Sequence, residues 1–218
     1  MSPSFLLPIV ALLAGYLLGS ISFAVIVARR HGIDILKAGS GNPGATNVKR
    51  VCGKGPGNLV FGLDVLKGAV ASGWPLVAAG AAHLAGWEIA AQAVLYAQLA
   101  GFAGAVLGHC FSIFLKFRGG KGVAVSVGGL CGALPPCLAV SAVVWLVTYF
   151  STRYVSLASL LGGISLPITA YWVWGAHDVR FGLCVAITAF IIFTHRGNIA
   201  RLLRGEENRF AKKKADGE

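Results

Sequence analysis

Three stretches of the sequence combine glycine with side chains that can bind an anion. The first stretch, residues 39–50, reads GSGNPGATNVKR and mixes three glycines with serine, threonine, asparagine, Lys49 and Arg50. The backbone amides of such a turn can form a concave nest that binds phosphate. No Gly-Lys-Ser/Thr sequence follows, so this is not a Walker A loop and a nucleotide is not implied. A simple glycine-rich connection between helices is the alternative interpretation.

The second stretch, residues 109–122, reads HCFSIFLKFRGGKG and ends just before an apolar segment that starts near Val123. A helix that begins there presents free amides and the positive end of its dipole, and Lys121 adds a charge beside them. Glycine weakens helices, and three glycines around this lysine have no obvious structural use, so we expect a phosphate or oxyanion site. A positively charged membrane anchor with flexible flanks is the alternative.

The third stretch, residues 195–207, reads HRGNIARLLRGEE. His195 and Asn198 share a face if a helix continues past Gly197, although a basic stop at the membrane surface is an equally simple interpretation. Asp64 and Lys67, one turn apart, are expected at the start of an apolar segment. They either form a local ion pair or face the same phosphate site.

The composition indicates the elements that must position these stretches. The chain has 218 residues, of which 56% are apolar and 12% charged, and this excludes an ordinary soluble domain. A formal net charge of +11 on so apolar a chain favours membrane phosphates and anionic substrates over DNA. The length predicts one domain over residues 1–218. Uncharged stretches that predict membrane-spanning helices cover residues 5–28, 59–82, 89–107, 123–150, 154–175 and 181–194.

The stretch 123–150 is long for one helix, and the pair Pro135-Pro136 interrupts it. If it crosses the membrane twice, all of the 19 lysines and arginines except Arg180 fall on the inner side. We therefore predict an all-α, polytopic integral membrane protein with seven transmembrane helices. Its N-terminus lies outside, its C-terminus lies in the cytoplasm, and the polar stretches are cytoplasmic catalytic loops. The helices on either side of the proline pair would have about 13 to 14 residues each.

Other functions require residues that this sequence lacks. The five cysteines have no paired spacing, and no HExxH or aspartate cluster is present, so we expect neither a metal nor a cofactor. A lipid head-group phosphotransferase would need such an aspartate cluster. A transporter or channel for an organic phosphate is the main rival, but its polar residues should follow a path across the bilayer. Here they gather on one predicted face.

The sequences GSGNPGATN, FLKFRGGKGV and HRGNIARLL, in this order with apolar spans between them, resemble the bacterial acyl-phosphate:glycerol-3-phosphate acyltransferases of the PlsY family. The resemblance covers nearly the whole chain and includes LDVLKG at residues 63–68. It implies transfer of a fatty acyl group from acyl phosphate to the sn-1 hydroxyl of glycerol 3-phosphate. The products are lysophosphatidate and phosphate, in the first acylation of bacterial phospholipid synthesis. The implied location is the cytoplasmic (inner) membrane, with membrane lipid as a partner and transient contact with an acyl-phosphate-producing enzyme, but no nucleic acid.

The resemblance also implies which residues act. The residues expected to be catalytic are Ser40, Arg50, Lys121, His195 and Asn198. The residues expected to bind substrate are Gly39, Gly41, Asn42, Gly44, Thr46, Asn47, Lys67, His109, Gly119, Gly120, Gly122 and Arg201. The departures from the usual family residues are small, and none removes a cation: Ser112 for proline, Arg118 for lysine and Val125 for threonine.

An acyl phosphate is already activated. The protein therefore mainly has to hold two anions together and to stabilise charge on the carbonyl and on the departing phosphate. The attacking hydroxyl must still lose a proton. We favour transfer of that proton to a phosphate oxygen of the donor, with His195 positioning or stabilising charge, because no carboxylate stands ready to orient His195 as a base. His195 acting as the base is the alternative.

Overall fold

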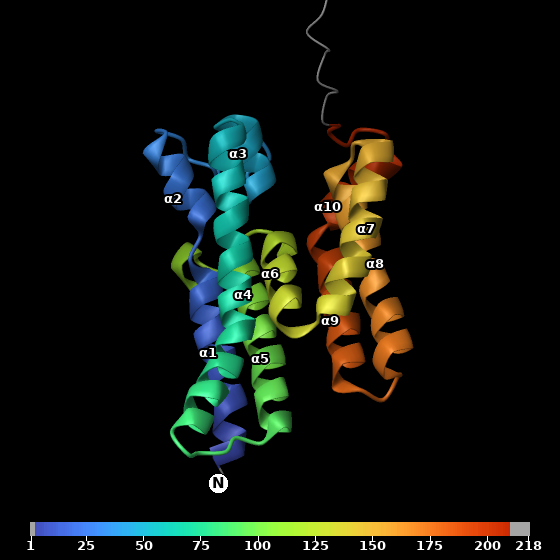
Figure 1. Cartoon of the computed structure of the whole chain (residues 1–218). Coiled ribbons are helices and arrows are strands. Elements are labelled where there is room, and N and C mark those ends of the chain that lie inside the picture. Colours follow the sequence, from blue (N-terminus) through green and yellow to red (C-terminus); the bar gives the residue numbers. More distant parts are fainter. Residues whose placement is uncertain (1–2, 210–218) are drawn as a thin grey trace, which may run out of the picture. The chain divides into compact units, whose positions relative to one another are not determined.

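Residues 3–209, the part of the chain that the computed structural model describes, form ten α-helices and one short 3-10 helix (Figure 1). The elements are α1 (Pro3–Ser20), α2 (Phe23–Arg30), α3 (Ala45–Val51), α4 (Lys54–Leu84), α5 (Ala91–Cys110), η1 (Ile113–Leu115), α6 (Val123–Ala133), α7 (Pro135–Thr152), α8 (Val155–Trp174), α9 (Val179–Thr194) and α10 (Arg196–Leu203). The prediction of an all-α chain is confirmed.

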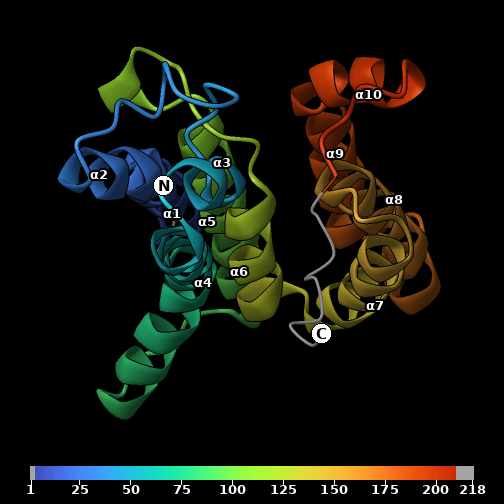
Figure 2. The same cartoon turned by 90° about the horizontal axis from the view of Figure 1, so that it is seen from above.

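Five segments within residues 3–209 are long and apolar enough to cross a membrane: residues 6–30, α4, α5, α7 and α8. Helices α9 and α10 bend by 60° at their junction, and together they would make a sixth span (Figure 2). Helix α6 has 11 residues, which is about 16 Å of helix against a hydrocarbon core of about 30 Å. The count of seven transmembrane helices therefore stays a prediction.

The chain divides into two compact units, an N-terminal unit of residues 1–135 and a C-terminal unit of residues 136–218. The single domain expected over residues 1–218 stays a prediction. In the N-terminal unit, α1 packs along α5 (Figure 1). The two backbones lie very close together. A Cβ atom at Gly15 would collide with the carbonyl of Gly101, and a Cβ atom at Gly104 would collide with the carbonyl of Leu12. Small residues thus allow these backbones to meet, as is common in membrane bundles.

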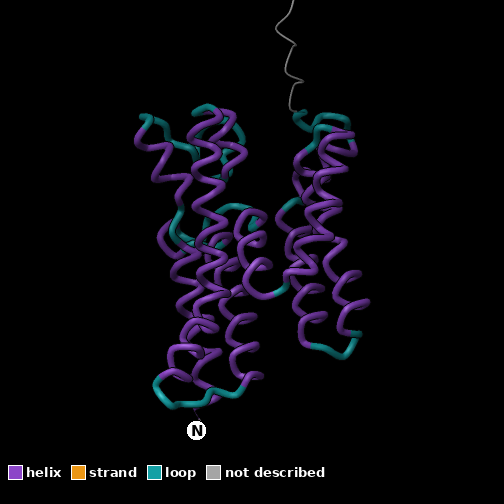
Figure 3. Tube along the Cα trace, in the orientation of Figure 1, coloured by secondary structure: helices purple, strands orange, loops and turns teal. Residues whose placement is uncertain are grey.

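The C-terminal unit is a bundle of helices joined by short loops (Figure 3). The Trp145 indole of α7 donates a hydrogen bond to Ser159 Oγ of α8 over 3.3 Å. The Thr188 hydroxyl of α9 donates to the Gly163 carbonyl of α8 over 2.7 Å. Helix α10 contacts both α8 and α9, so the third polar stretch is held by this bundle.

The first apolar stretch is a broken helix, which the sequence did not indicate. Helix α1 ends at Ser20, and α2 starts after Ser22, whose hydroxyl accepts from the Val25 amide over 3.4 Å. The break leaves backbone carbonyls without helical partners, and in a membrane each of them needs a donor. Ser112 Oγ donates to the Ser20 carbonyl over 2.6 Å, and Lys67 Nζ to the Ile21 carbonyl over 2.8 Å.

The break at the proline pair is confirmed, but the predicted helix lengths are wrong. Helix α6 has 11 residues and α7 has 18, instead of about 13 to 14 each. The reason is that Pro135 starts α7 instead of lying in a connection. Proline suits the first position of a helix because its fixed φ is helical and the amide there would have no helical partner.

Candidate active site

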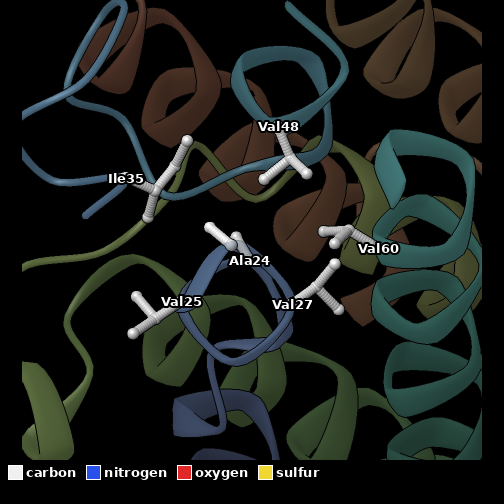
Figure 4. Close-up of a cluster of buried hydrophobic side chains, with 7 residues drawn as sticks. Ala24, Val25, Val27, Ile35, Val48 and Val60 are labelled. Atoms are coloured by element: carbon white, nitrogen blue, oxygen red, sulfur yellow. The ribbon is translucent and has the colours of Figure 1, made fainter. Parts of the chain in front are cut away.

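The first polar stretch lies over a small apolar core in the N-terminal unit (Figure 4). This core consists of Ala24, Val25, Val27, Ala28, Ile35, Val48 and Val60, which are at most 7% exposed. We expected an irregular turn over residues 39–50, but its second half is helix α3. Val48 points from α3 into the core, which explains why this half becomes helical. Thr46, Asn47 and Arg50 are therefore placed by a helix.

Asn47 organises the turn that precedes α3. Its side chain is buried; Oδ1 accepts from the Ser40 amide over 3.0 Å, and Nδ2 donates to the carbonyls of Ala38 over 2.9 Å and Ile35 over 3.4 Å. Gly39 has a φ of 58°, and a Cβ atom there would collide with Asn47 Oδ1. Asn47 therefore fixes the backbone of the turn. Its expected contact with substrate stays a prediction.

The side chains that remain accessible in the first stretch are polar or cationic. Ser40 and Arg50 are exposed, while Asn42 and Thr46 are half-buried. Gly41 is in the left-handed region with a φ of 68°, and Gly44 forms the N-cap of α3. Within residues 3–209, the Arg50 guanidinium has no hydrogen bond or ion pair with another residue. It is a cation that an anionic ligand can reach.

In the second stretch, α6 begins at Val123, as predicted. Our expectation that its glycines have no structural use is wrong. A Cβ atom at Gly119 would collide with the carbonyls of His109 and Cys110, and one at Gly120 with His109 Nε2. The Gly120 amide also donates to the His109 carbonyl over 3.0 Å. The glycines let this segment lie directly on the C-terminal end of α5.

The segment 119–122, which we call the glycine–lysine loop, ends at the start of a helix. Gly122 is the N-cap of α6 with a φ of 82°, and no side chain caps this helix. Amides in the first turn of a helix lack helical acceptors, so Lys121 lies next to a group of positively polarised donors. Leu115 of η1 packs against the same apolar core as α3. Two of the three polar stretches therefore meet one core in the N-terminal unit.

A buried ionic group joins α4 to α5 within the same unit. Lys67 Nζ lies 2.9 Å from Asp64 Oδ1, and both side chains are 2% exposed. His109 Nδ1 lies 3.7 Å from the same carboxylate oxygen. The local ion-pair interpretation is thereby confirmed, but its expected place is wrong, because α4 already starts at Lys54 and the pair lies well inside it. The expected contacts of Lys67 and His109 with substrate stay predictions.

The third stretch belongs to the C-terminal unit, where α10 continues past Gly197, which is the condition we set for His195 and Asn198 to share a face. His195 and Asn198 are both buried, at 3% and 7% exposure. His195 Nδ1 lies 2.9 Å from the Ile191 carbonyl, which can only accept a hydrogen bond. Nδ1 therefore carries the hydrogen, and Nε2 of the neutral ring is the nitrogen with the lone pair. The Ile191 backbone carbonyl therefore orients this imidazole.

Sequence reasoning missed Glu207, which binds three polar side chains of the C-terminal unit. Asn198 Nδ2 donates to Oε1 over 2.7 Å, Ser156 Oγ to Oε1 over 3.0 Å, and Arg201 Nε to Oε2 over 2.7 Å. Burial raises the pKa of Glu207, but these three hydrogen bonds outweigh it, so that the pKa lies below its ordinary value. The Glu207 carboxylate therefore holds Asn198 and Arg201 in place, and their expected contacts with substrate stay predictions.

The signal for Glu207 was present in the sequence. Gly205 follows α10 with a φ of 71°, and the Glu206 amide donates to the Arg201 carbonyl over 2.8 Å. This is the Schellman pattern, which reverses the chain after a helix and is typical of glycine at that position. The reversal brings Glu207 back to the face of α10 that carries Asn198 and Arg201.

The described residues form no metal site of protein ligands. Among residues 3–209, no three histidine, cysteine, aspartate or glutamate side chains gather so that they could hold a metal ion. The three polar stretches supply cations, backbone amides, hydroxyls, side-chain amides and the imidazoles of His109 and His195. Such a set can bind anions and stabilise charge that develops on oxygen atoms.

Residues 9–205 match the family model described as glycerol-3-phosphate acyltransferase. A glycerol-3-phosphate acyltransferase of Rhodopseudomonas palustris (strain BisB5) is 43% identical over 207 residues, covering 94% of this chain and 97% of the relative. A protein of the same name from Aquifex aeolicus (strain VF5) is 41% identical over 195 residues, covering 89% of this chain and 95% of the relative.

Two solved structures of PlsY (YgiH), an integral membrane glycerol 3-phosphate acyltransferase, are similar to this chain. The glycerol 3-phosphate form has a TM-score of 0.76 and 39% identity, and covers 95% of this chain and 96% of that one. The lysophosphatidic acid form has a TM-score of 0.75 and 38% identity, with coverage of 94% and 95%. The chain is thus a multi-pass membrane enzyme and belongs to the glycerol-3-phosphate acyltransferase family of the PlsY type.

Proposed function

We propose that this enzyme takes its acyl group from acyl phosphate and transfers it to the sn-1 hydroxyl of glycerol 3-phosphate. The products are 1-acyl-glycerol 3-phosphate (lysophosphatidate) and phosphate, and the reaction is the first acylation of bacterial phospholipid synthesis. The observation that carries the proposal is the pair of cationic sites in the N-terminal unit. Arg50 is exposed and has no polar partner among residues 3–209, and Lys121 lies at the N-terminus of α6. Donor and acceptor are both anions in this reaction, so each phosphate needs positive charge near it.

The reaction needs no group beyond the two substrates and the side chains. The sn-1 oxygen attacks the acyl carbonyl carbon, a carbon–oxygen bond forms there, and the bond from that carbon to the phosphate oxygen breaks. The departing phosphate keeps the electron pair and takes the proton that the hydroxyl loses. Lys121 and Arg50 stabilise the phosphate charges, while Ser40 and Asn198 donate hydrogen bonds to substrate oxygens.

His195 positions the acceptor and stabilises charge in this proposal. Its Nδ1–H donates to the Ile191 carbonyl, which fixes the orientation of the ring in either protonation state. A test is the pH dependence of His195→Ala. We expect the wild-type rate to change little with pH around 6.5, the usual imidazole range, and the variant to be slower with the same profile. A wild-type rate that rises steeply through that range, with the rise absent in the variant, would make His195 the base.

The proposal includes the orientation in the membrane. Residues 1–218 act as one acyltransferase domain with seven transmembrane helices in the bacterial inner membrane, the N-terminus outside and the three polar stretches in the cytoplasm. The charge distribution supports it, because Arg180 is the one lysine or arginine assigned to the outer side. The Arg180 guanidinium is neutralised by Asp178, with an Nη2–Oδ2 distance of 2.7 Å.

The donor is tested with detergent-purified protein, glycerol 3-phosphate and one acyl donor at a time. We expect acylated product with palmitoyl phosphate and none with palmitoyl-CoA or palmitoyl-acyl carrier protein. Product from either thioester at a comparable rate would overturn the donor assignment. Lys116→Ala serves as a control for preparation and folding, since Lys116 is exposed and has no role in the proposed chemistry.

A further inference from the structure

The N-terminal unit buries a group of three ionisable side chains, Asp64, Lys67 and His109, which we call the Asp64 cluster. Its side chains are 2%, 2% and 7% exposed. Ionisable side chains inside a membrane bundle carry a large desolvation penalty, even when they are paired. Apolar side chains of similar volume would fill this space without that penalty. The cluster therefore calls for a role other than filling the bundle.

The His109 imidazole lies between the cluster and the glycine–lysine loop. On one edge of the ring, Nδ1 is 3.7 Å from Asp64 Oδ1. On the other edge, Nε2 occupies the space that a Cβ atom of Gly120 would need. The Gly120 amide also donates to the His109 carbonyl over 3.0 Å. Any movement of the ring toward the loop must therefore displace Gly120, which is the residue next to Lys121.

The other contacts of the cluster fix its position in the bundle. Lys67 Nζ donates to the carbonyl of Ile21, at the break between α1 and α2, over 2.8 Å. One residue further along α4, a Cβ atom at Gly68 would collide with the carbonyl of Val125 in the first turn of α6. The cluster is thus tied to α1, α4, α5 and the start of α6. Of these elements, α5 and α6 adjoin the glycine–lysine loop directly: Gly119 and Gly120 lie against the end of α5, and Gly122 caps α6.

We infer that Asp64 and His109 are positioning residues for acyl transfer. The Asp64 carboxylate attracts the Nδ1 edge of the imidazole across 3.7 Å, and the Nε2 edge of the ring sets the place of Gly120. The loop then holds Lys121 beside the amides of α6. Lys67 balances the Asp64 charge and anchors the cluster at the helix break. The inference rests on the proposed function of Lys121 as a phosphate-binding residue, and it gives His109 and Lys67 roles that need no contact with substrate.

A double-mutant cycle on His109 and Gly120 tests the inference. His109→Asn keeps an amide that can face Asp64 but removes the ring edge at Gly120, while Gly120→Ala adds a methyl group that collides with that edge. We expect each single variant to raise the KM for glycerol 3-phosphate about tenfold, and the double variant to be no worse than either one. Multiplying effects in the double variant would overturn the inference. His83→Asn is the matched control, at the exposed far end of α4.

A test of the role of Asp64 needs a variant that still folds. Asp64→Asn alone leaves Lys67 buried without its counter-charge, so Asp64→Asn is combined with Lys67→Met. We expect this variant to melt near the wild-type temperature and to have a KM for glycerol 3-phosphate raised about fivefold. A wild-type KM would overturn the role of Asp64.

Lys121→Ala separates this inference from the proposed function. If it leaves the KM unchanged, the phosphate role of Lys121 fails and the inference fails with it. If it raises the KM while the His109 and Asp64 variants behave as wild type, the inference fails alone.

Discussion

The two units of this membrane enzyme hold their polar residues in different ways. The N-terminal unit uses glycines that allow backbones to touch and an ion pair that is 2% exposed on both sides. The C-terminal unit uses the Glu207 carboxylate in the coil after α10, paired with Arg201; the Glu207 side chain is 7% exposed and the Arg201 side chain is 36% exposed. The first arrangement is rigid and shielded from solvent. In the second, the carboxylate is largely covered, but solvent reaches the pair through the Arg201 side chain.

The difference predicts how each unit responds to change. A buried pair in a low dielectric is costly to break, because the remaining charge is left without a partner. A partly exposed pair contributes little, and its contribution depends on pH and ionic strength. Steric and charge substitutions should therefore act most strongly in the N-terminal unit. Solution conditions should act most strongly in the C-terminal unit.

The largest effect is expected at the glycine–lysine loop. Lys121→Ala should lower kcat/KM about 100-fold or more, which is about 3 kcal/mol of transition-state stabilisation. The reason is that, in the proposed reaction, Lys121 is one of two cations that offset phosphate charge. Steady-state rates with acyl phosphate and glycerol 3-phosphate give the value. Lys116→Ala, on an exposed position of the same stretch, should stay within about twofold of wild type, and equal small losses in both variants would refute the assignment of Lys121.

The next effect concerns helix packing in the N-terminal unit. Gly68→Ala places a methyl group on the carbonyl of Val125 and should destabilise the protein by about 2–3 kcal/mol. Gly62→Ala is the matched control on the same helix, because no atom lies within 4 Å of its added Cβ. It should be neutral or stabilise by about 0.5 kcal/mol, since alanine favours a helix. Thermal melting in detergent measures both, and similar melting temperatures would contradict the close packing of α4 on α6.

A smaller effect is expected in the C-terminal unit. Glu207→Gln removes the ion pair with Arg201 and turns one acceptor into a donor, so it should cost about 1 kcal/mol of stability. Glu206→Gln is the control, because the Glu206–Arg204 pair is more than half exposed and should contribute almost nothing. If the Glu207→Gln variant is as stable as the Glu206→Gln variant, the Glu207 carboxylate does not stabilise the C-terminal unit.

The smallest expected effect is on how the stability of the protein depends on pH. The pKa of Glu207 in the folded protein lies below its ordinary value, so the contribution of its ionised form is complete above about pH 4.5. It is lost as the pH falls from there through the lowered pKa. Melting temperature between about pH 7 and pH 3 should therefore fall less steeply for Glu207→Gln than for wild type. Parallel curves would show that the Glu207 pKa is not lowered.

Local signals in the sequence were sufficient for several features. The proline pair predicted a break, and the apolar segment after Gly122 predicted a helix start at Val123. The spacing of Asp64 and Lys67 indicated a local ion pair as one of two interpretations. Each of these depends on backbone geometry or on residues within one helical turn. That is why one sequence without its structure sufficed for them.

Features that depend on distant contacts were not predictable in this way. The break between α1 and α2 depends on donors from Lys67 and Ser112, which lie far along the chain. Glycine is required at position 120 because His109, at the end of α5, occupies the space that a Cβ atom there would need. Glu207 gained its role from the chain reversal after α10. In each case the sequence shows the residue type, but the residue that it contacts is brought to it only by the fold.

We propose that this chain by itself moves an acyl group from acyl phosphate to glycerol 3-phosphate. Detergent-purified protein with these two compounds as the reactants should release one phosphate for each 1-acyl-glycerol 3-phosphate formed. Replacing glycerol 3-phosphate with glycerol should abolish both signals. Phosphate release without acylation, acylation without phosphate release, or acylation at the sn-2 hydroxyl would contradict the claim.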